Sequence, residues 1–85
     1  MKVLIPGALR SYTERSVAEA AGATLGAALL DLERQYPGIR FRVVDEQDRI
    51  RRHIRIFVNG TQARDIDFVL NRSDEIIIVQ ALSGG

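Results

Sequence analysis

Apolar and polar residues alternate most regularly in segment 53–58, and this alternation predicts a β-strand. Ile54, Ile56 and Val58 occupy every second position, so they share one face of the strand, whereas Phe57 falls on the other face. The pattern therefore indicates a strand with one buried face and one face on which an aromatic side chain stands among polar neighbours.

Shorter apolar segments bounded by turn residues predict the remaining strands. The last of them, 75–82, has apolar residues on both faces, as expected of a central strand. Asn59-Gly60, directly after 53–58, is typical of a type I′ hairpin turn because both residues tolerate a positive φ. The other predicted strands are 3–5, 16–20 and 61–64.

A helical period marks the segment that follows Thr24. Apolar residues recur there three and four positions apart, and Thr24 can cap the helix by accepting a backbone N–H from its first turn. Pro37-Gly38 is expected to end the helix, because proline disfavours helical geometry in the residue before it. The apolar stripe consists of Leu25, Ala28, Leu29, Leu32 and Tyr36.

The order strand, strand, helix, strand, strand, strand predicts an α+β domain, with one main helix on one face of a mixed sheet of four to five strands. We expect a turn at 9–15, and a loop at 39–52 with room for a short strand at 41–44. The first and last strands are both apolar throughout, and we infer that they pair in parallel at the centre of the sheet. That arrangement is the β-grasp, or ubiquitin-like, fold. We expect a single domain over 1–82 and a flexible C-terminal tail over 83–85.

The composition excludes several classes of protein. The 85 residues include no cysteine and one histidine, which excludes a disulfide scaffold, a thiol nucleophile and Cys- or His-based metal clusters. The apolar runs are far shorter than the roughly 20 residues that a membrane helix needs. The net charge of +1 gives no basic excess of the kind that accompanies non-specific nucleic-acid binding. We therefore expect a cytoplasmic domain with no nucleic-acid or membrane partner.

The end of the chain carries the most specific chemical signal. Gly84 and Gly85 follow the predicted central strand with only Ser83 between them. A terminal carboxyl is ionised at neutral pH and is a poor electrophile, but an enzyme can activate it by transferring AMP from ATP. Glycine has no Cβ, so two glycines can pass through a narrow tunnel to such an active site. The alternative interpretation of the pair is a frayed end.

The sequence resembles the small sulfur-carrier proteins of the MoaD/ThiS family over its whole length. The terminal Gly-Gly is the specific element of this resemblance, and the other matching segments are generic for the fold. The matching segments are 2–5, 24–36, 58–60, 74–78 and 80–85.

The resemblance implies a mechanism and a set of partners. In that family an adenylating enzyme of the ubiquitin-activating type activates the C-terminal glycine with ATP, and the adenylate is converted to a thiocarboxylate. Gly85 would carry the sulfur, and Leu82, Ser83 and Gly84 would form the tail that threads into the partner. A sulfur donor and a downstream sulfur-accepting synthase are further implied partners. The chain would be a substrate rather than an enzyme, with no bound cofactor, because ATP belongs to the activating enzyme.

Three outcomes for the tail stay open at this stage. The segments around 36–39 and 57–60 are most similar to the carriers of thiocarboxylate-dependent cysteine synthesis, with thiamine and molybdopterin carriers as the other branches. A second hypothesis is a ubiquitin-like protein modifier, in which Gly85 forms an isopeptide bond with a target lysine. A third is a β-grasp binding module whose tail is inert.

Two surface features bear on partner binding. Phe57, Ile77 and Val79 are expected on the sheet face that the helix leaves open, where they would dock the activating enzyme, unless a loop or the chain's own edge covers them. Basic residues also cluster before and within 53–58. We interpret this cluster as a solvated face that helps to steer a partner, rather than as a phosphate or RNA site. Its members are Arg49, Arg51, Arg52 and Arg55.

Overall fold

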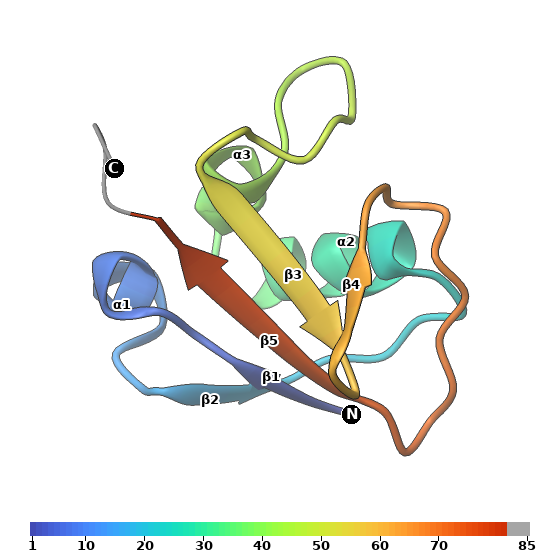
Figure 1. The fold of residues 1–85 in the computed structure, drawn as a ribbon. Helices are drawn as coiled ribbons and strands as arrows, with labels where there is room; N and C mark the ends of the chain where they lie inside the picture. Colours follow the sequence, from blue (N-terminus) through green and yellow to red (C-terminus); the bar gives the residue numbers. More distant parts are fainter. Residues whose placement is uncertain (82–85) are drawn as a thin grey trace.

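The computed structural model describes residues 1–81 and shows a sheet with its helices on one side (Figure 1). The sheet has five strands. They are β1 (Lys2–Leu4), β2 (Val17–Glu19), β3 (Ile54–Val58), β4 (Thr61–Ala63) and β5 (Glu75–Gln80). The helices are α1 (Arg10–Thr13), α2 (Leu25–Gln35) and α3 (Ile39–Val43), with a 3₁₀ turn, η1 (Gly7–Leu9), before α1.

The sheet is mixed, with the strand order β2-β1-β5-β3-β4. The two strands nearest the chain ends, β1 and β5, pair in parallel, and every other pairing is antiparallel. The predicted parallel pairing of the first and last strands is therefore confirmed. It places β5 at the centre, between β1 and β3.

The core lies between α2 and one face of the sheet. Leu25, Leu29 and Leu32 of α2 are at most 2% exposed, and they face a sheet surface made by the alternate residues of β3 and β5. The predicted cap is present, since the Ala27 N–H donates to Thr24 Oγ1 at 3.2 Å. The buried sheet residues include Val3, Ala18, Ile54, Ile56, Ile76 and Ile78.

The loop prediction for 39–52 is wrong in its first part, because residues 39–43 form the helix α3. No strand forms at 41–44; Val44 makes only an isolated bridge with Ile50. The helix is stabilised by a distant cap, in which the Glu33 carboxylate accepts the N–H groups of Gly38 at 2.8 Å and Arg40 at 3.0 Å. Ile39 and Val43, one helical turn apart, are both 1% exposed. Tertiary contacts therefore decide the conformation of this segment.

The segment 9–15, predicted as a turn, contains helical structure instead. The turn η1 ends at Leu9 and α1 follows directly; its C-cap, Glu14, has a left-handed φ of 57°. Leu9 is 1% exposed, so the segment is fixed to the core by one apolar side chain. The predicted boundary between domain and tail, at residue 82, lies outside the described residues.

The Glu33 cap gives a prediction for the pH dependence of stability. The Gly38 N–H, and after it the Arg40 N–H, hold the pKa of the Glu33 carboxyl below its ordinary value of 4.5. A carboxyl whose folded pKa is depressed stabilises the fold fully above the unfolded pKa, and this contribution is lost as pH falls through the folded value. Glu33→Ala is expected to lower the free energy of unfolding by about 1 kcal/mol at neutral pH, as for other lost caps.

Urea unfolding of wild type, Glu33→Ala and Glu33→Gln at neutral and acidic pH measures this effect. The glutamine variant keeps an acceptor oxygen but loses the charge. The difference between its free energy of unfolding and that of wild type is therefore expected to shrink as pH falls below about 4.5. An equal loss of unfolding free energy in Glu33→Gln at both pH values would contradict the assignment of the cap to the charged carboxylate.

Candidate functional site

The structure shows where the C-terminal tail is attached. Gln80 ends β5 opposite Ile54, and the Ala81 N–H still donates to the His53 carbonyl at 2.8 Å. Since β5 is the central strand and is paired with a neighbour on each side, the tail begins from the middle of the sheet and not from an edge strand. The predicted tail residues Leu82, Ser83, Gly84 and Gly85 lie outside the described residues.

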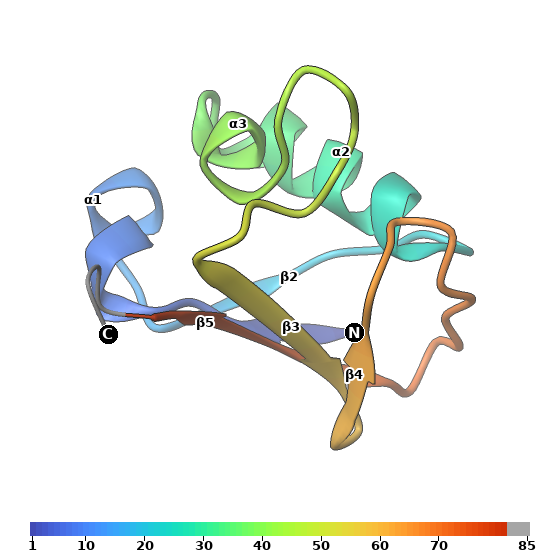
Figure 2. The same ribbon diagram turned by 45° about the horizontal axis from the view of Figure 1, so that its top comes forward.

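The three predicted docking residues share the sheet face opposite the helices. Figure 2 shows α2 and α3 on one side of the strands, and over residues 1–81 no other element covers the opposite side. Phe57 lies directly opposite Ile77 in the β3–β5 register, both half-buried, and Val79 is 40% exposed. Neither a loop nor a sheet edge of the described residues covers this patch.

The patch extends further than the sequence analysis expected. Leu4 of β1 pairs with Ile77 on one side and with Val17 of β2 on the other. Val17 is 39% exposed. On the far side, Phe57 pairs with Gln62 of β4. One row of side chains therefore crosses all strands of the sheet, and we call this row the open-face row: Val17, Leu4, Ile77, Phe57 and Gln62.

Leu4 and Val17 could not be assigned to this face from the sequence pattern alone. The alternation that buries Val3 puts Leu4 on the opposite face, but only the pairing of β1 with both neighbours brings these residues beside Ile77. Charged residues flank the open-face row. Exposed Lys2 is paired in register with Glu19 and Glu75, and exposed Arg55 lies opposite Val79. An apolar centre with a polar rim is typical of a protein-binding surface.

The start of β5 is fixed by a network of hydrogen bonds from the hairpin. Asn59 Nδ2 donates to Asp74 Oδ1 at 2.7 Å, and the Glu75 N–H donates to Asn59 Oδ1 at 3.0 Å. Asn59 and Gly60 have φ values of 50° and 86°, so the predicted turn with two positive φ angles is confirmed. Asp74 is only 7% exposed. The network holds β5 in register with β3 and thereby sets which residues face outward.

The described residues hold no candidate metal site. Within residues 1–81, no three His, Cys, Asp or Glu side chains are grouped so that they could hold a metal ion. In the same part of the chain, no helix has the length and apolar character needed to cross a membrane. Among the described residues, the candidate functional features are the open-face row, its charged rim and the attachment point of the tail.

Comparison with known proteins identifies the family. The model of the ThiS family matches residues 3–85. The sulfur carrier protein CysO of Mycobacterium tuberculosis is 36% identical over 90 residues, which cover 98% of this chain and 96% of that protein. The sulfur carrier protein CysO of Mycobacterium bovis has the same identity and coverage.

Solved structures agree with this result. The crystal structure of M. tuberculosis CysO has a TM-score of 0.89 at 31% identity, covering 95% of this chain and 98% of that one. A chain of the Amycolatopsis orientalis BexX/CysO complex has a TM-score of 0.91 at 31% identity, covering 99% of this chain and 98% of that one. The solution structure of the small archaeal modifier protein 1 of Methanosarcina acetivorans has a TM-score of 0.83 at 27% identity, covering 99% of this chain and 94% of that one. The predicted β-grasp fold is thus confirmed, and the chain belongs to the ThiS family.

Proposed function

We propose that this chain is a sulfur carrier that works through the carboxyl group of Gly85. The observation that carries the proposal is the family match, which runs to residue 85, together with the likeness to CysO sulfur carriers over nearly the whole chain. In the proposed first step the Gly85 carboxylate attacks the α-phosphorus of ATP, giving an acyl-adenylate and releasing pyrophosphate. A sulfide equivalent from the sulfur donor then attacks the acyl carbon, AMP leaves, and a thiocarboxylate remains.

The residue types in the tail suit this chemistry. The reacting group is a main-chain carboxyl, so the carrier needs no nucleophile or base of its own. The four residues after Ala81 can span at most about 14 Å, and two of them lack a Cβ that would widen the tail. ATP is consumed by the activating enzyme, and the carrier is its protein substrate rather than a catalyst, with no bound cofactor.

The open-face row, together with the neighbouring Val79, is the proposed docking surface for the activating enzyme. Val79 lies two residues before Ala81, so the exposed apolar surface reaches the point where the tail begins. A partner that covers Phe57, Ile77 and Val79 is therefore in position to receive the tail. The BexX/CysO complex supports this proposal to the extent that a CysO protein of similar fold forms a complex with another protein.

The proposed sulfur acceptor belongs to cysteine biosynthesis. The resemblance to carriers of thiocarboxylate-dependent cysteine synthesis and the likeness to CysO proteins both favour this branch over thiamine or molybdopterin synthesis. A downstream synthase would accept the sulfur from the Gly85 thiocarboxylate, and hydrolysis of the acyl–sulfur bond, with water supplying the oxygen, would regenerate the carboxylate.

A second candidate function is protein modification, which the likeness to small archaeal modifier protein 1 favours. Activation would be identical, but the amine of a target lysine would attack the acyl carbon, forming an isopeptide bond. The carrier and the modifier therefore share the adenylation step and differ only in the group that receives the acyl carbon.

ATP–pyrophosphate exchange tests the step that both functions need. The purified chain is mixed with the ubiquitin-activating-type adenylating enzyme of its own organism, labelled pyrophosphate and ATP. We expect label to enter ATP only when the chain is present, because exchange requires reversible adenylation of its carboxyl. Exchange of equal rate without the chain, or no exchange with it, would contradict the proposed function.

A further inference from the structure

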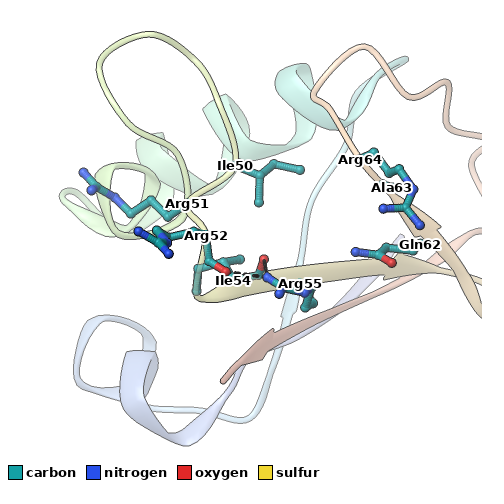
Figure 3. Close-up of a pocket in the computed structure, with 8 residues that line it drawn as sticks. All are labelled: Ile50, Arg51, Arg52, Ile54, Arg55, Gln62, Ala63 and Arg64. Atoms are coloured by element: carbon teal, nitrogen blue, oxygen red, sulfur yellow. Dashed lines mark hydrogen bonds between the residues drawn. The ribbon is translucent and has the colours of Figure 1, made fainter. Parts of the chain in front are cut away.

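The described residues form a hollow of about 300 Å³ beside the start of β3, which shares only Gln62 with the open-face row (Figure 3). Four of its eight lining residues are arginines. Arg51 and Arg52 come from the loop before β3, Arg55 from β3 itself, and Arg64 from the residue after β4. Three separate segments therefore line the hollow with arginines in a chain whose net charge is only +1, and the charged end of Arg51 points toward Phe41 of α3, away from the hollow (Figure 3).

Two of these guanidinium groups are held in place by neutral partners. Arg55 Nη1 donates to the carbonyl oxygens of Ile54, at 3.1 Å, and Arg52. Arg51 Nε donates to the Phe41 carbonyl at 2.7 Å, and its guanidinium carbon lies 4.5 Å from the centre of the Phe41 ring. A guanidinium has five N–H donors, so each keeps donors for a further acceptor. Backbone carbonyls and an aromatic ring carry no compensating charge, although Arg51 is near enough to the Asp45 carboxylate to help lower the pKa of that group.

Three other arginines of the described chain are paired with carboxylates, whereas Arg10, Arg15, Arg42 and Arg72 form no such pair within residues 1–81. Arg34, Arg40 and Arg49 lie 2.7, 2.9 and 3.9 Å from carboxylate oxygens of Asp31, Asp48 and Asp45. Over residues 1–81, none of the four arginines of the hollow lies within 4.0 Å of a carboxylate oxygen. Arg52, Arg55 and Arg64 are exposed. The hollow thus presents guanidinium groups whose usual acceptors are missing from the described chain.

The position of the hollow indicates which partner would meet it. The His53 carbonyl, between Arg52 and Ile54 in sequence, accepts the Ala81 N–H at the base of the tail. Arg55 also lies opposite Val79, at the rim of the open-face row. A protein that covers this row and takes up the tail therefore lies next to the hollow.

We propose that the arginine hollow receives an acidic segment of the activating enzyme, with Asp or Glu carboxylates as acceptors for Arg52, Arg55 and Arg64. This proposal rests on the proposed function, because it places the same enzyme on the hollow and on the tail. A guanidinium pairs with a carboxylate through two parallel hydrogen bonds, so the contact fixes orientation as well as adding attraction. A nucleic acid fits less well, since the hollow has no aromatic residue on which a base could stack.

The test compares single charge reversals in ATP–pyrophosphate exchange. Arg52→Glu and Arg64→Glu are each expected to raise the KM for the carrier by about tenfold or more, because the acidic segment then meets a like charge. The kcat at saturating carrier is expected to stay unchanged, since the tail is untouched. Arg72→Glu is the matched control: it makes the same charge change on an exposed arginine in the turn before β5, at the opposite end of that strand, and is expected to alter KM less than twofold.

Salt and folding controls complete the experiment. The increase in KM is expected to shrink at about 0.5 M NaCl, where charges are screened within a few ångströms. Arg52→Gln and Arg64→Gln, which remove charge without reversing it, are expected to raise KM by a smaller factor, and urea unfolding checks that every variant is folded. Exchange by wild type with KM values for Arg52→Glu and Arg64→Glu equal to that of Arg72→Glu would overturn this proposal alone.

Two other outcomes are informative. No exchange with the wild-type chain would contradict the proposed function and this proposal together. Binding of a single-stranded RNA of about 20 nucleotides that is lost in Arg52→Glu, with unchanged KM in exchange, would overturn the proposal in favour of a nucleic-acid site.

Discussion

Removal of Gly84 and Gly85 is expected to abolish ATP–pyrophosphate exchange, with a loss of more than about 100-fold. The shortened chain still ends in a carboxylate, but that carboxylate is drawn back by about 7 Å, and misplacement of a reacting group by about 1 Å can already cost a hundredfold. Adding one alanine after Gly85 is expected to be equally damaging, because the carboxyl then lies beyond the α-phosphate and carries a methyl group at its Cα.

Gly84→Val tests the width of the tail at constant length. The branched side chain is expected to reduce exchange strongly, because the proposed tunnel admits only a chain without a Cβ at this position. These positions follow β5, which ends at Gln80, so the urea midpoint of all tail variants is expected to equal that of wild type. Full exchange by the shortened chain would contradict the assignment of the reacting carboxyl to Gly85.

Phe57→Asp is expected to raise the KM for the carrier in exchange by about 100-fold, since an aromatic residue at the centre of an interface contributes about 2–4 kcal/mol. The fold is expected to persist, because Phe57 lies half-buried on the open face and not in the core. The loss of its cross-strand contact with Ile77 costs the fold only about 0.2–1 kcal/mol.

Leu30→Asp is the matched control for this substitution. Leu30 lies on α2 and is 52% exposed, so it offers an exposed apolar side chain on the helix side of the domain. The KM for the Leu30→Asp variant is expected to stay within about twofold of wild type. The KM for Phe57→Leu is expected to lie between those of wild type and Phe57→Asp. Equal KM values for Phe57→Asp and Leu30→Asp would show that the enzyme does not dock on the open face.

The elements predicted best were those whose pattern and packing agree. The alternation in 53–58 and the two apolar faces of 75–82 correspond to the central part of the sheet, and the cap and stripe after Thr24 correspond to α2. The helix α3 could not be predicted in this way. Ile39 and Val43 do not distinguish a helix from a loop by themselves, and the capping carboxylate comes from Glu33 on another helix.

Part of the candidate site follows from the sequence pattern, and the rest depends on tertiary contacts. The alternation within two strands placed Phe57, Ile77 and Val79 on one face, and the register now brings Phe57 and Ile77 together. Leu4 and Val17 required the strand order. The predicted basic cluster included Arg49, which pairs instead with Asp45, and omitted Arg64, which only the path of the chain after β4 brings to the hollow. The roles of these residues in docking, and of Leu82 to Gly85 in the reaction, remain predictions.

Mass spectrometry of the chain purified from its own organism tests the central claim most directly. The sulfur-carrier account predicts a fraction of intact chain that is heavier by the difference between one sulfur and one oxygen atom, with the change located at Gly85 by fragmentation. Treatment with an alkylating reagent should label that fraction at its C-terminus, since the chain contains no cysteine to compete. Gly85 found only as a free carboxylate, or only in isopeptide linkage to lysines of other proteins, would contradict the account.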